Sequence, residues 1–214
     1  MTSIESITLE VPDPATASSF YAAAFAEAPH LQLRPGQAPT SGFRGFTLSL
    51  VMSQRAAVDG VIDTAVKAGA TTLKPAAKAF WGGYSGVVRA PDGAIWKIAT
   101  AAKKDAGPPS QRIDEMVLLL GVANVAATKR FYLDHGLSVA KSFGSKYVEF
   151  ATSPGAVKLG LYARRALAKD AGISPDGSGS HRIIIGGNTE SFTDPDGFAW
   201  EPASLRAERP STTA

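Results

Sequence analysis

The sequence uses one arrangement of landmarks twice. Each copy has a Phe-Tyr pair, Phe20-Tyr21 in the first and Phe131-Tyr132 in the second, and later a Pro-Asp-Gly turn that leads to a tryptophan. The turns begin at Pro91 and Pro195, so both landmarks recur in the same order. A repeat over such a distance indicates that one structural unit is used twice. We therefore expect two modules with the same order of elements.

The division between the modules follows from composition. Residues 100–112 are rich in Lys, Ala, Gly and Pro, which is typical of a linker. We expect a first module at residues 1–100, a linker at 101–112 and a second module at 113–204. The polar residues 205–214 are expected to form a mobile tail.

Both modules should open with a strand followed by a helix. Apolar and polar residues alternate over 6–11, the pattern of a strand with one buried face, and Asp13 and Pro14 are suited to begin a helix. The apolar run at 115–122 and Asn124 repeat this arrangement. Helical spacing also predicts helices at 58–69 and 163–172.

Most of the remaining segments favour strands. Short runs rich in strand-forming residues occupy 46–51, 147–152, 157–162 and 181–186. Each copy closes on a hairpin that its Pro-Asp-Gly turn sets. The pattern predicts an α+β fold with two sheets of mainly antiparallel strands and the helices outside.

Composition excludes several classes of function. The chain is 44% hydrophobic and 19% charged, as is usual for globular proteins, and its formal charge of +3 is too scattered to predict nucleic-acid binding. It has no cysteine, which removes disulfides and thiolate metal sites. No apolar stretch is long enough for a membrane helix, and the beginning lacks the pattern of a secretory signal. We expect a cytoplasmic protein without a membrane or nucleic-acid partner.

Four segments carry a family resemblance: SITLEVPDPATASSFY, WGGYSGVVRAPDGAIWK, SHRIIIGG and FTDPDGFAWE. They resemble the vicinal oxygen chelate superfamily, which includes glyoxalases, bleomycin-resistance proteins, fosfomycin-resistance transferases and extradiol dioxygenases. The resemblance covers nearly the whole chain. It implies two tandem βαβββ modules whose mixed, mainly antiparallel sheets curl into cups that enclose a small-molecule cavity.

The resemblance also implies positions for a divalent metal. One cup would gather Ser6, His181 and Glu201, and Glu10 lies on the same strand face as Ser6. Open catalytic metal sites usually need three good protein ligands, and a serine hydroxyl is a poor one. Two other interpretations stay open for His181 and Glu201: a metal-free catalytic pair with the imidazole as general base, or two structural residues.

The second cup differs in charge. The resemblance places Glu115, Lys97 and Arg44 there, and a lysine ammonium cannot bind a cation. Lys97 would either pair with Glu115 and close the cup, or remain available for an anionic ligand. We expect no metal in this cup.

Aromatic residues have two expected positions. Trp96 and Trp200 alternate with charged neighbours and should lie in the core. Phe80, Trp81 and Tyr84 flank a Gly-Gly pair near the expected rim of a cup. They would form either a lid over an organic ligand or a plug at the end of the sheet.

Three functions remain. The first is a protein that binds, and in one version processes, a small organic molecule in a cup without a cofactor. The second is a metal-dependent lyase, transferase or dioxygenase that uses His181 and Glu201. The third is a non-catalytic interaction module whose pockets are filled by its own side chains. Because one chain supplies both modules, either a monomer or a homodimer is expected.

Overall fold

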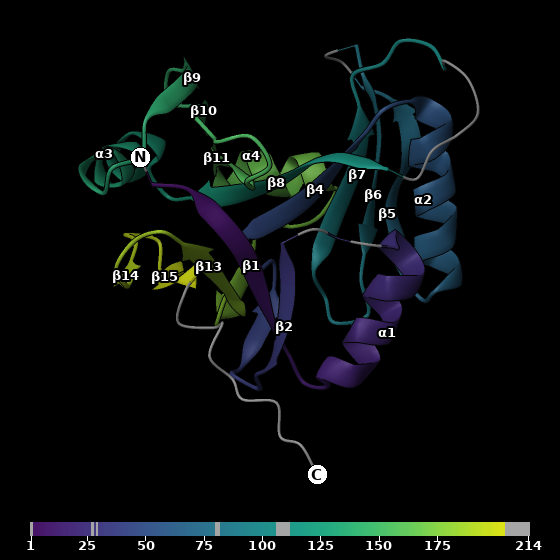
Figure 1. Ribbon diagram of the computed structural model, residues 1–214, viewed down its shortest axis with the longest axis horizontal. Coiled ribbons are helices and arrows are strands. Elements are labelled where there is room, and N and C mark those ends of the chain that lie inside the picture. The colour runs from purple at the N-terminus through teal and green to yellow at the C-terminus, as the bar shows by residue number, and fades with distance from the viewer. Residues whose placement is uncertain (1, 27, 29, 80–81, 106–111, 204–214) are drawn as a thin grey trace.

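The computed structural model describes residues 2–26, 28, 30–79, 82–105 and 112–203 (Figure 1). The elements of the first half are β1 (Ile4–Val11), α1 (Pro14–Phe25), β2 (Leu31–Pro35), β3 (Thr40–Gly42), β4 (Phe46–Met52), α2 (Arg55–Lys67), β5 (Thr71–Lys78), β6 (Tyr84–Arg89) and β7 (Ile95–Thr100). Those of the second half are β8 (Ile113–Val122), α3 (Val125–Asp134), β9 (Val139–Phe143), β10 (Tyr147–Phe150), β11 (Lys158–Ala163), α4 (Arg164–Ala171), β12 (Gly177–Gly179), β13 (Ile183–Gly187), β14 (Phe192–Thr193) and β15 (Ala199–Pro202).

The expected α+β class is confirmed. The described strands form a five-stranded sheet in the order β14-β15-β13-β1-β2, an eight-stranded sheet in the order β5-β6-β7-β4-β8-β11-β10-β9, and a small ribbon of β12 and β3. The sheets are mixed but mainly antiparallel. Part of the expected linker, residues 106–111, and the expected tail at 205–214 lie outside the described residues.

Each half of the chain lends its opening strand to a sheet that the other half completes. β1 pairs antiparallel with β13, and β8 pairs antiparallel with β4. Neither large sheet therefore belongs to a single half. The two halves thus exchange their opening strands.

The eight-stranded sheet contains two similar units side by side. β4, α2 and β5–β7 form a βαβββ unit in which the first strand pairs in parallel with the last. β8, α3 and β9–β11 repeat this arrangement, and β8 pairs in parallel with β11. The five-stranded sheet is assembled from the strands at the two ends of the chain (Figure 1).

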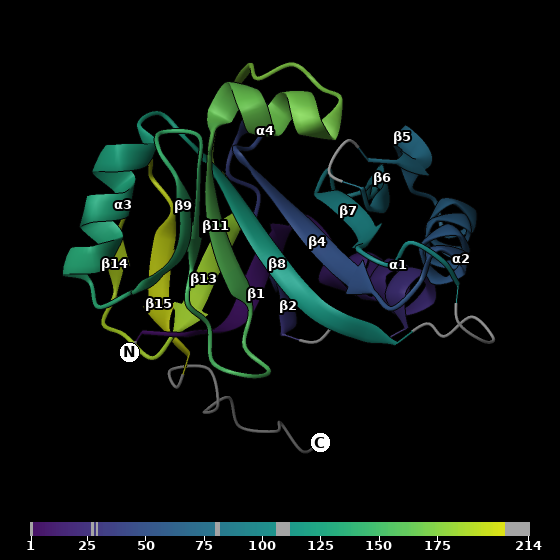
Figure 2. The ribbon, with the colours of Figure 1, turned by 90° about the horizontal axis from the view of Figure 1, so that it is seen from above.

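The main core lies between the two large sheets and under α1, α2 and α3 (Figure 2). Alternate residues of each strand enter it, for example Ile7 and Leu9 of β1 and Leu48 and Leu50 of β4, all with exposed fractions of 0%. Trp96 and Trp200 are buried in the same cluster, as expected. Within the described residues, none of the helices combines the length and apolar character needed to span a bilayer.

The helix starts predicted at Asp13 and Asn124 are confirmed, whereas the helix predicted to start at residue 58 begins at Arg55. The Asp13 side chain accepts hydrogen bonds from the amides of Ala15 and Thr16, and Asn124 does the same at the start of α3. These contacts satisfy amide groups that have no partner within the helix. Each cap fixes where the chain leaves the opening strand and turns into the helix.

A buried chain of hydrogen bonds explains why the Phe-Tyr pair and the tryptophan recur together. In the second half the Tyr132 hydroxyl donates to Asp194 at 2.7 Å and accepts from the Trp200 indole at 3.2 Å. In the first half Tyr21 donates to Asp92 at 2.7 Å and accepts from Trp96 at 3.4 Å. Each chain links a helix to the closing hairpin of the same half.

Removal of the Tyr132 hydroxyl should show how much this hydrogen-bond chain contributes to the stability of the fold. Tyr132→Phe leaves the Trp200 N–H without its acceptor and removes a donor from the Asp194 carboxyl, whose pKa burial already raises. We predict a loss of about 1–3 kcal/mol in the free energy of unfolding, measured by urea denaturation. Tyr84→Phe, which removes an exposed hydroxyl contact to Asp59, is the control and should cost less than about 0.5 kcal/mol. Equal losses would contradict the role of the buried chain.

The two buried tyrosines also predict a dependence of stability on alkaline pH. Burial, together with the neighbouring carboxylates, raises the pKa of Tyr21 and of Tyr132 well above the usual value for a phenol. The folded protein thus keeps protons that the unfolded chain releases above about pH 10, so this stability is complete below that pH and is lost above it. In urea denaturation between pH 8 and 11, the double variant Tyr21→Phe/Tyr132→Phe should lose stability less steeply than the parent. Parallel pH profiles would show the prediction to be wrong.

Candidate functional site

Three of the expected ligand positions share the outer face of the five-stranded sheet. Ser6 and Glu10 of β1 point away from the core because they alternate with buried residues, and Glu201 does so because its neighbour Trp200 is buried. Ser6 and Glu201 both lie beside Gly186 of β13, one on each side. The structure therefore brings the expected serine and glutamates to one face.

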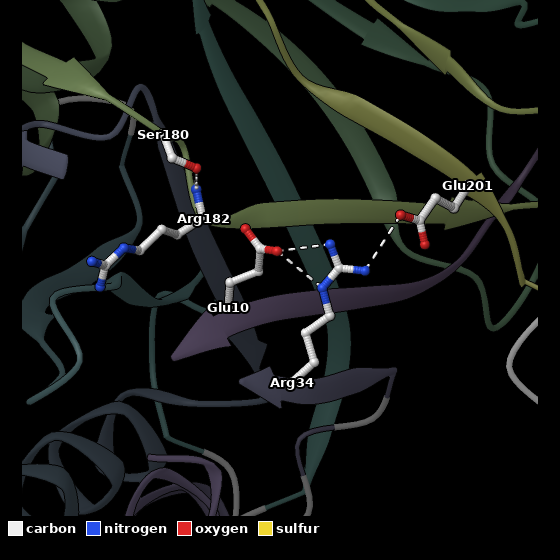
Figure 3. Close-up of polar contacts among 5 residues, drawn as sticks. All are labelled: Glu10, Arg34, Ser180, Arg182 and Glu201. Carbon is white, nitrogen blue, oxygen red and sulfur yellow. Dashed lines mark hydrogen bonds and ion pairs between the residues drawn. The ribbon is translucent and has the colours of Figure 1, made fainter. Parts of the chain in front are cut away.

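A side-chain cation already lies between the two glutamates of this face. Arg34 of β2 donates from Nε and Nη2 to Glu10 Oε1 at 3.0 and 2.7 Å, and its Nη1 lies 3.4 Å from Glu201 Oε1 (Figure 3). A guanidinium cannot lose its proton in a protein, so it is a permanent charge. Arg34 thus occupies the position between the carboxylates where a metal ion would have to bind.

Ser6 serves the packing of the sheet. It is 5% exposed, and a Cβ added at Gly186 would lie 2.2 Å from its Oγ. The absence of a side chain at Gly186 is what allows Ser6 to fit against β13. No described group hydrogen-bonds the Ser6 hydroxyl.

The structure does not bring His181 to Glu201. The strand expected at 181–186 begins only at Ile183, because Arg182 has a positive φ of 52° that breaks the extended backbone. Glu201 lies beside Gly186, five residues further on and inside the strand that His181 does not join. The contacts of His181 therefore do not support the expected pair with Glu201 or the ligand set of Ser6, Glu10, His181 and Glu201, and both stay predictions.

His181 instead joins loops of the chain. Its Nδ1 hydrogen-bonds the Arg44 carbonyl oxygen, its Nε2 lies 3.0 Å from the Asp196 carbonyl oxygen, and its ring stacks on Phe198 with centroids 4.0 Å apart. Both ring nitrogens are therefore engaged by the main chain. Figure 3 shows the neighbouring Arg182 directed away from the cluster around Arg34.

The other candidate residues lie on the eight-stranded sheet, on the face that carries α4. Lys97 pairs with Asp170 of α4 at 2.7 Å, and not with Glu115 as considered from the sequence. Glu115 pairs with Lys158 of the neighbouring strand at 2.9 Å. The two expected partners are kept apart because each has a closer partner of opposite charge.

Helix α4 fills the middle of this face, which we call the α4 face (Figure 2). Leu167, Ala168 and Ala171 are buried there in a cluster that also contains Val87, Ile95 and Leu119 of the sheet. The Lys74 ammonium donates to the main-chain carbonyls of residues 169 and 170 at 2.8 and 2.6 Å. A cation at the carboxyl end of a helix is favourable, so Lys74 and Lys97 together hold the last turn of α4.

The aromatic group expected at a rim is only partly described. Tyr84 lies on the opposite face of the sheet from α4, where its hydroxyl donates to Asp59 at 2.8 Å and Arg55 lies over its ring. Phe80 and Trp81 are outside the described residues. Tyr84 is therefore corrected from a ligand contact to a contact with α2.

Comparison with solved structures gives full-length matches. Glyoxalase I from Zea mays matches with a TM-score of 0.63 and 13% identity, over 94% of this chain and 91% of the other. A candidate dioxygenase from Bacillus subtilis matches with a TM-score of 0.58 and 12% identity, over 98% of this chain and 91% of the other. The chain has the glyoxalase-type fold. Neither protein-family models nor curated proteins give a match to the sequence.

Two larger cavities lie next to α4 and the β3–β12 ribbon, one of 700 Å³ at the start of the helix and one of 370 Å³ beyond its end. The lining residues of the second come from three parts of the chain: Thr40, Ser41, Gly42, Phe43, Arg44, Arg89, Gly93, Ile173, Ser174 and Asp176. A smaller cavity of 190 Å³ contains Lys97 and Asp170. We call the cavity of 370 Å³ the Arg44 cavity.

The sequence alone could not predict the partners of several residues of the site. Arg34 lies on β2, whose residues 31–35 alternate between apolar and polar side chains, a signal that could have predicted a strand. Asp170 belongs to a helix that the sequence predicts, but nothing in the sequence places that helix on the sheet. The partners of Glu201 and Lys97 therefore come from segments that only the folded chain brings together.

Removal of a buried side chain should show that α4 is part of the folded core. Leu167→Ala deletes a side chain with an exposed fraction of 0%, so we predict a loss of about 2–5 kcal/mol in the free energy of unfolding and faster hydrogen exchange in α4. The control is Leu133→Ala on α3, which is 43% exposed. Unchanged exchange in α4 would contradict the prediction.

Proposed function

We propose that this protein binds a small organic molecule and does so without a metal ion. The observation that carries the proposal is the presence of a paired cation on each sheet: Arg34 between Glu10 and Glu201, and Lys97 beside Asp170. A divalent ion at either place would have to displace a fixed positive charge. Arg34 offsets one of the two negative charges of Glu10 and Glu201, and Lys97 offsets that of Asp170.

The donor set supports the same conclusion. Within the described parts of the chain, no group of three or more His, Asp or Glu side chains converges in a way that could hold a metal. His181, the best candidate donor in the sequence, has main-chain carbonyl oxygens at both ring nitrogens. These contacts argue against the metal-dependent lyase, transferase or dioxygenase, and equally against His181 as a general base.

Binding therefore has better support than catalysis. The Arg44 cavity, at 370 Å³, falls within the range of about 300–1,000 Å³ that is usual for small-molecule sites. The glyoxalase I and the candidate dioxygenase that share the fold carry enzyme names, but likeness of fold does not transfer an activity. Side chains of α4 fill the middle of the α4 face. For that part of the sheet alone, this agrees with a non-catalytic interaction module whose pockets are filled by its own side chains.

A metal titration tests the proposal. We predict that Mn²⁺, Ni²⁺, Zn²⁺ and Fe²⁺ leave the melting temperature of the protein unchanged, because an ion raises it only if it binds the folded state. Metal analysis of the purified protein should accordingly find no stoichiometric ion. Glu201→Gln is the matched variant, since it removes the carboxylate that a metal at Arg34 would need. A rise in melting temperature with one metal that Glu201→Gln abolishes would disprove metal independence.

A further inference from the structure

Two residues of the Arg44 cavity each carry a buried polar atom without a hydrogen-bond partner. Thr40 Oγ1 and Arg44 Nη1 are among four such side-chain atoms in the described residues, and both residues line the cavity. Buried polar groups in folded proteins are nearly always hydrogen-bonded, so each exception calls for an explanation. The guanidinium at this cavity therefore has hydrogen-bonding capacity that the described residues do not use.

Within the part of the chain that the structure describes, Arg44 is held in position without an ion pair. Its Nη2 donates to the Asp92 carbonyl oxygen, and it packs against Gly93, where an added Cβ would lie 2.9 Å from Nη2. Asp92 lies near enough to favour its charge, but the Asp92 carboxylate already accepts from Tyr21 and the amide of Ala94. Burial lowers the pKa of Arg44, which reflects a guanidinium that is partly removed from water. A buried cation of this kind is costly unless an anion approaches it.

A second arginine completes the basic side of the cavity. Arg89 ends β6 beside Ile95, so it points to the α4 face, and it forms no hydrogen bond or ion pair with the described residues. The opposing charge is Asp176, whose carboxylate accepts from the Ser174 hydroxyl at 2.7 Å. Arg182 adds a further positive charge near Arg44. The arginines outnumber the carboxylates around the cavity.

The other wall of the cavity is apolar. Phe43, which is 2% exposed, and Ile173 line it and belong to the cluster under α4. An apolar wall next to a few placed polar groups is the usual make-up of a small-molecule site. A ligand with one charged end and one apolar part would satisfy both sides.

We infer that the Arg44 cavity binds the carboxylate or phosphate group of a small organic anion, with Arg44 and Arg89 as its donors. The inference rests on the proposed function for the organic part of the ligand. It adds the site, the charge of the ligand and the two residues that recognise it. Arginine is suited to both groups, because its N–H donors match the oxygens of a carboxylate or a phosphate.

The test compares anionic probes with a neutral one. Benzoate, phenyl phosphate, inorganic phosphate and the neutral benzamide are titrated calorimetrically into the intact protein at constant ionic strength, so that screening stays equal. We expect saturable 1:1 binding of benzoate or phenyl phosphate and at least about tenfold weaker binding of benzamide. Comparison of benzoate with phenyl phosphate tells a carboxylate site from a phosphate site, and inorganic phosphate shows whether the anion alone suffices.

Four variants locate the site. Arg89→Ala should weaken binding of the anionic probe at least about tenfold and leave that of benzamide unchanged, and Arg89→Lys should restore part of the loss. Arg130→Ala on α3 removes an exposed arginine elsewhere and should have no effect. Arg165→Ala removes a charge from the neighbouring 700 Å³ cavity at the start of α4 and should also have no effect.

Each contrary outcome has a distinct meaning. Loss of binding in Arg165→Ala but not in Arg89→Ala, or equal small losses in all three alanine variants, would overturn the assignment to this cavity. Equal binding of benzoate and benzamide, unaffected by Arg89→Ala, would overturn the anion site but leave the proposed binding function standing. Absence of binding by every probe would overturn the anion site as well. Failure of metal independence would appear in the metal titration and not in these measurements.

Discussion

A buried tyrosine in each half joins an aspartate to a tryptophan, and the arrangement of the sheets depends on these two hydrogen-bond chains. Tyr21 and Tyr132 lie on helices, while their partners Trp96 and Trp200 lie on the closing strands of the two halves. Each of these hydrogen-bond chains thereby fixes which face of the closing strand meets the core. Once the tryptophan is buried, the next residue, Lys97 or Glu201, must point to the other face.

The two outer faces then differ in how their charged side chains are paired. Glu201 and Glu10 share one guanidinium, whereas Lys97 meets the carboxylate of a helix that covers the sheet. In both arrangements an ion pair offsets a charge that the alternation of the strand places outside the core. They leave a surplus of positive charge beyond the end of α4, at Arg44 and Arg89.

Much of the fold could be predicted because its signals are local. The caps at Asp13 and Asn124, the Pro-Asp-Gly turns and the alternation along β1 each depend on residues close in sequence. Period-two alternation likewise put Ser6 and Glu10 on one strand face, and the family resemblance implied that Glu201 lies near them. The partners of these residues could not be predicted, since Arg34 and Asp170 approach through sheet pairing and helix packing. One backbone conformation, at Arg182, was enough to remove His181 from its expected strand.

The pairing of β1 with β13 has a consequence for how the protein is made. A ribosome delivers β1 long before β13, so the apolar side chains of Ile7 and Leu9 must wait for their antiparallel neighbour. Contacts between such distant segments make folding slow. The eight-stranded sheet, whose central strands β4 and β8 are much nearer in the chain, can assemble first and serve as the template on which the two ends of the polypeptide meet.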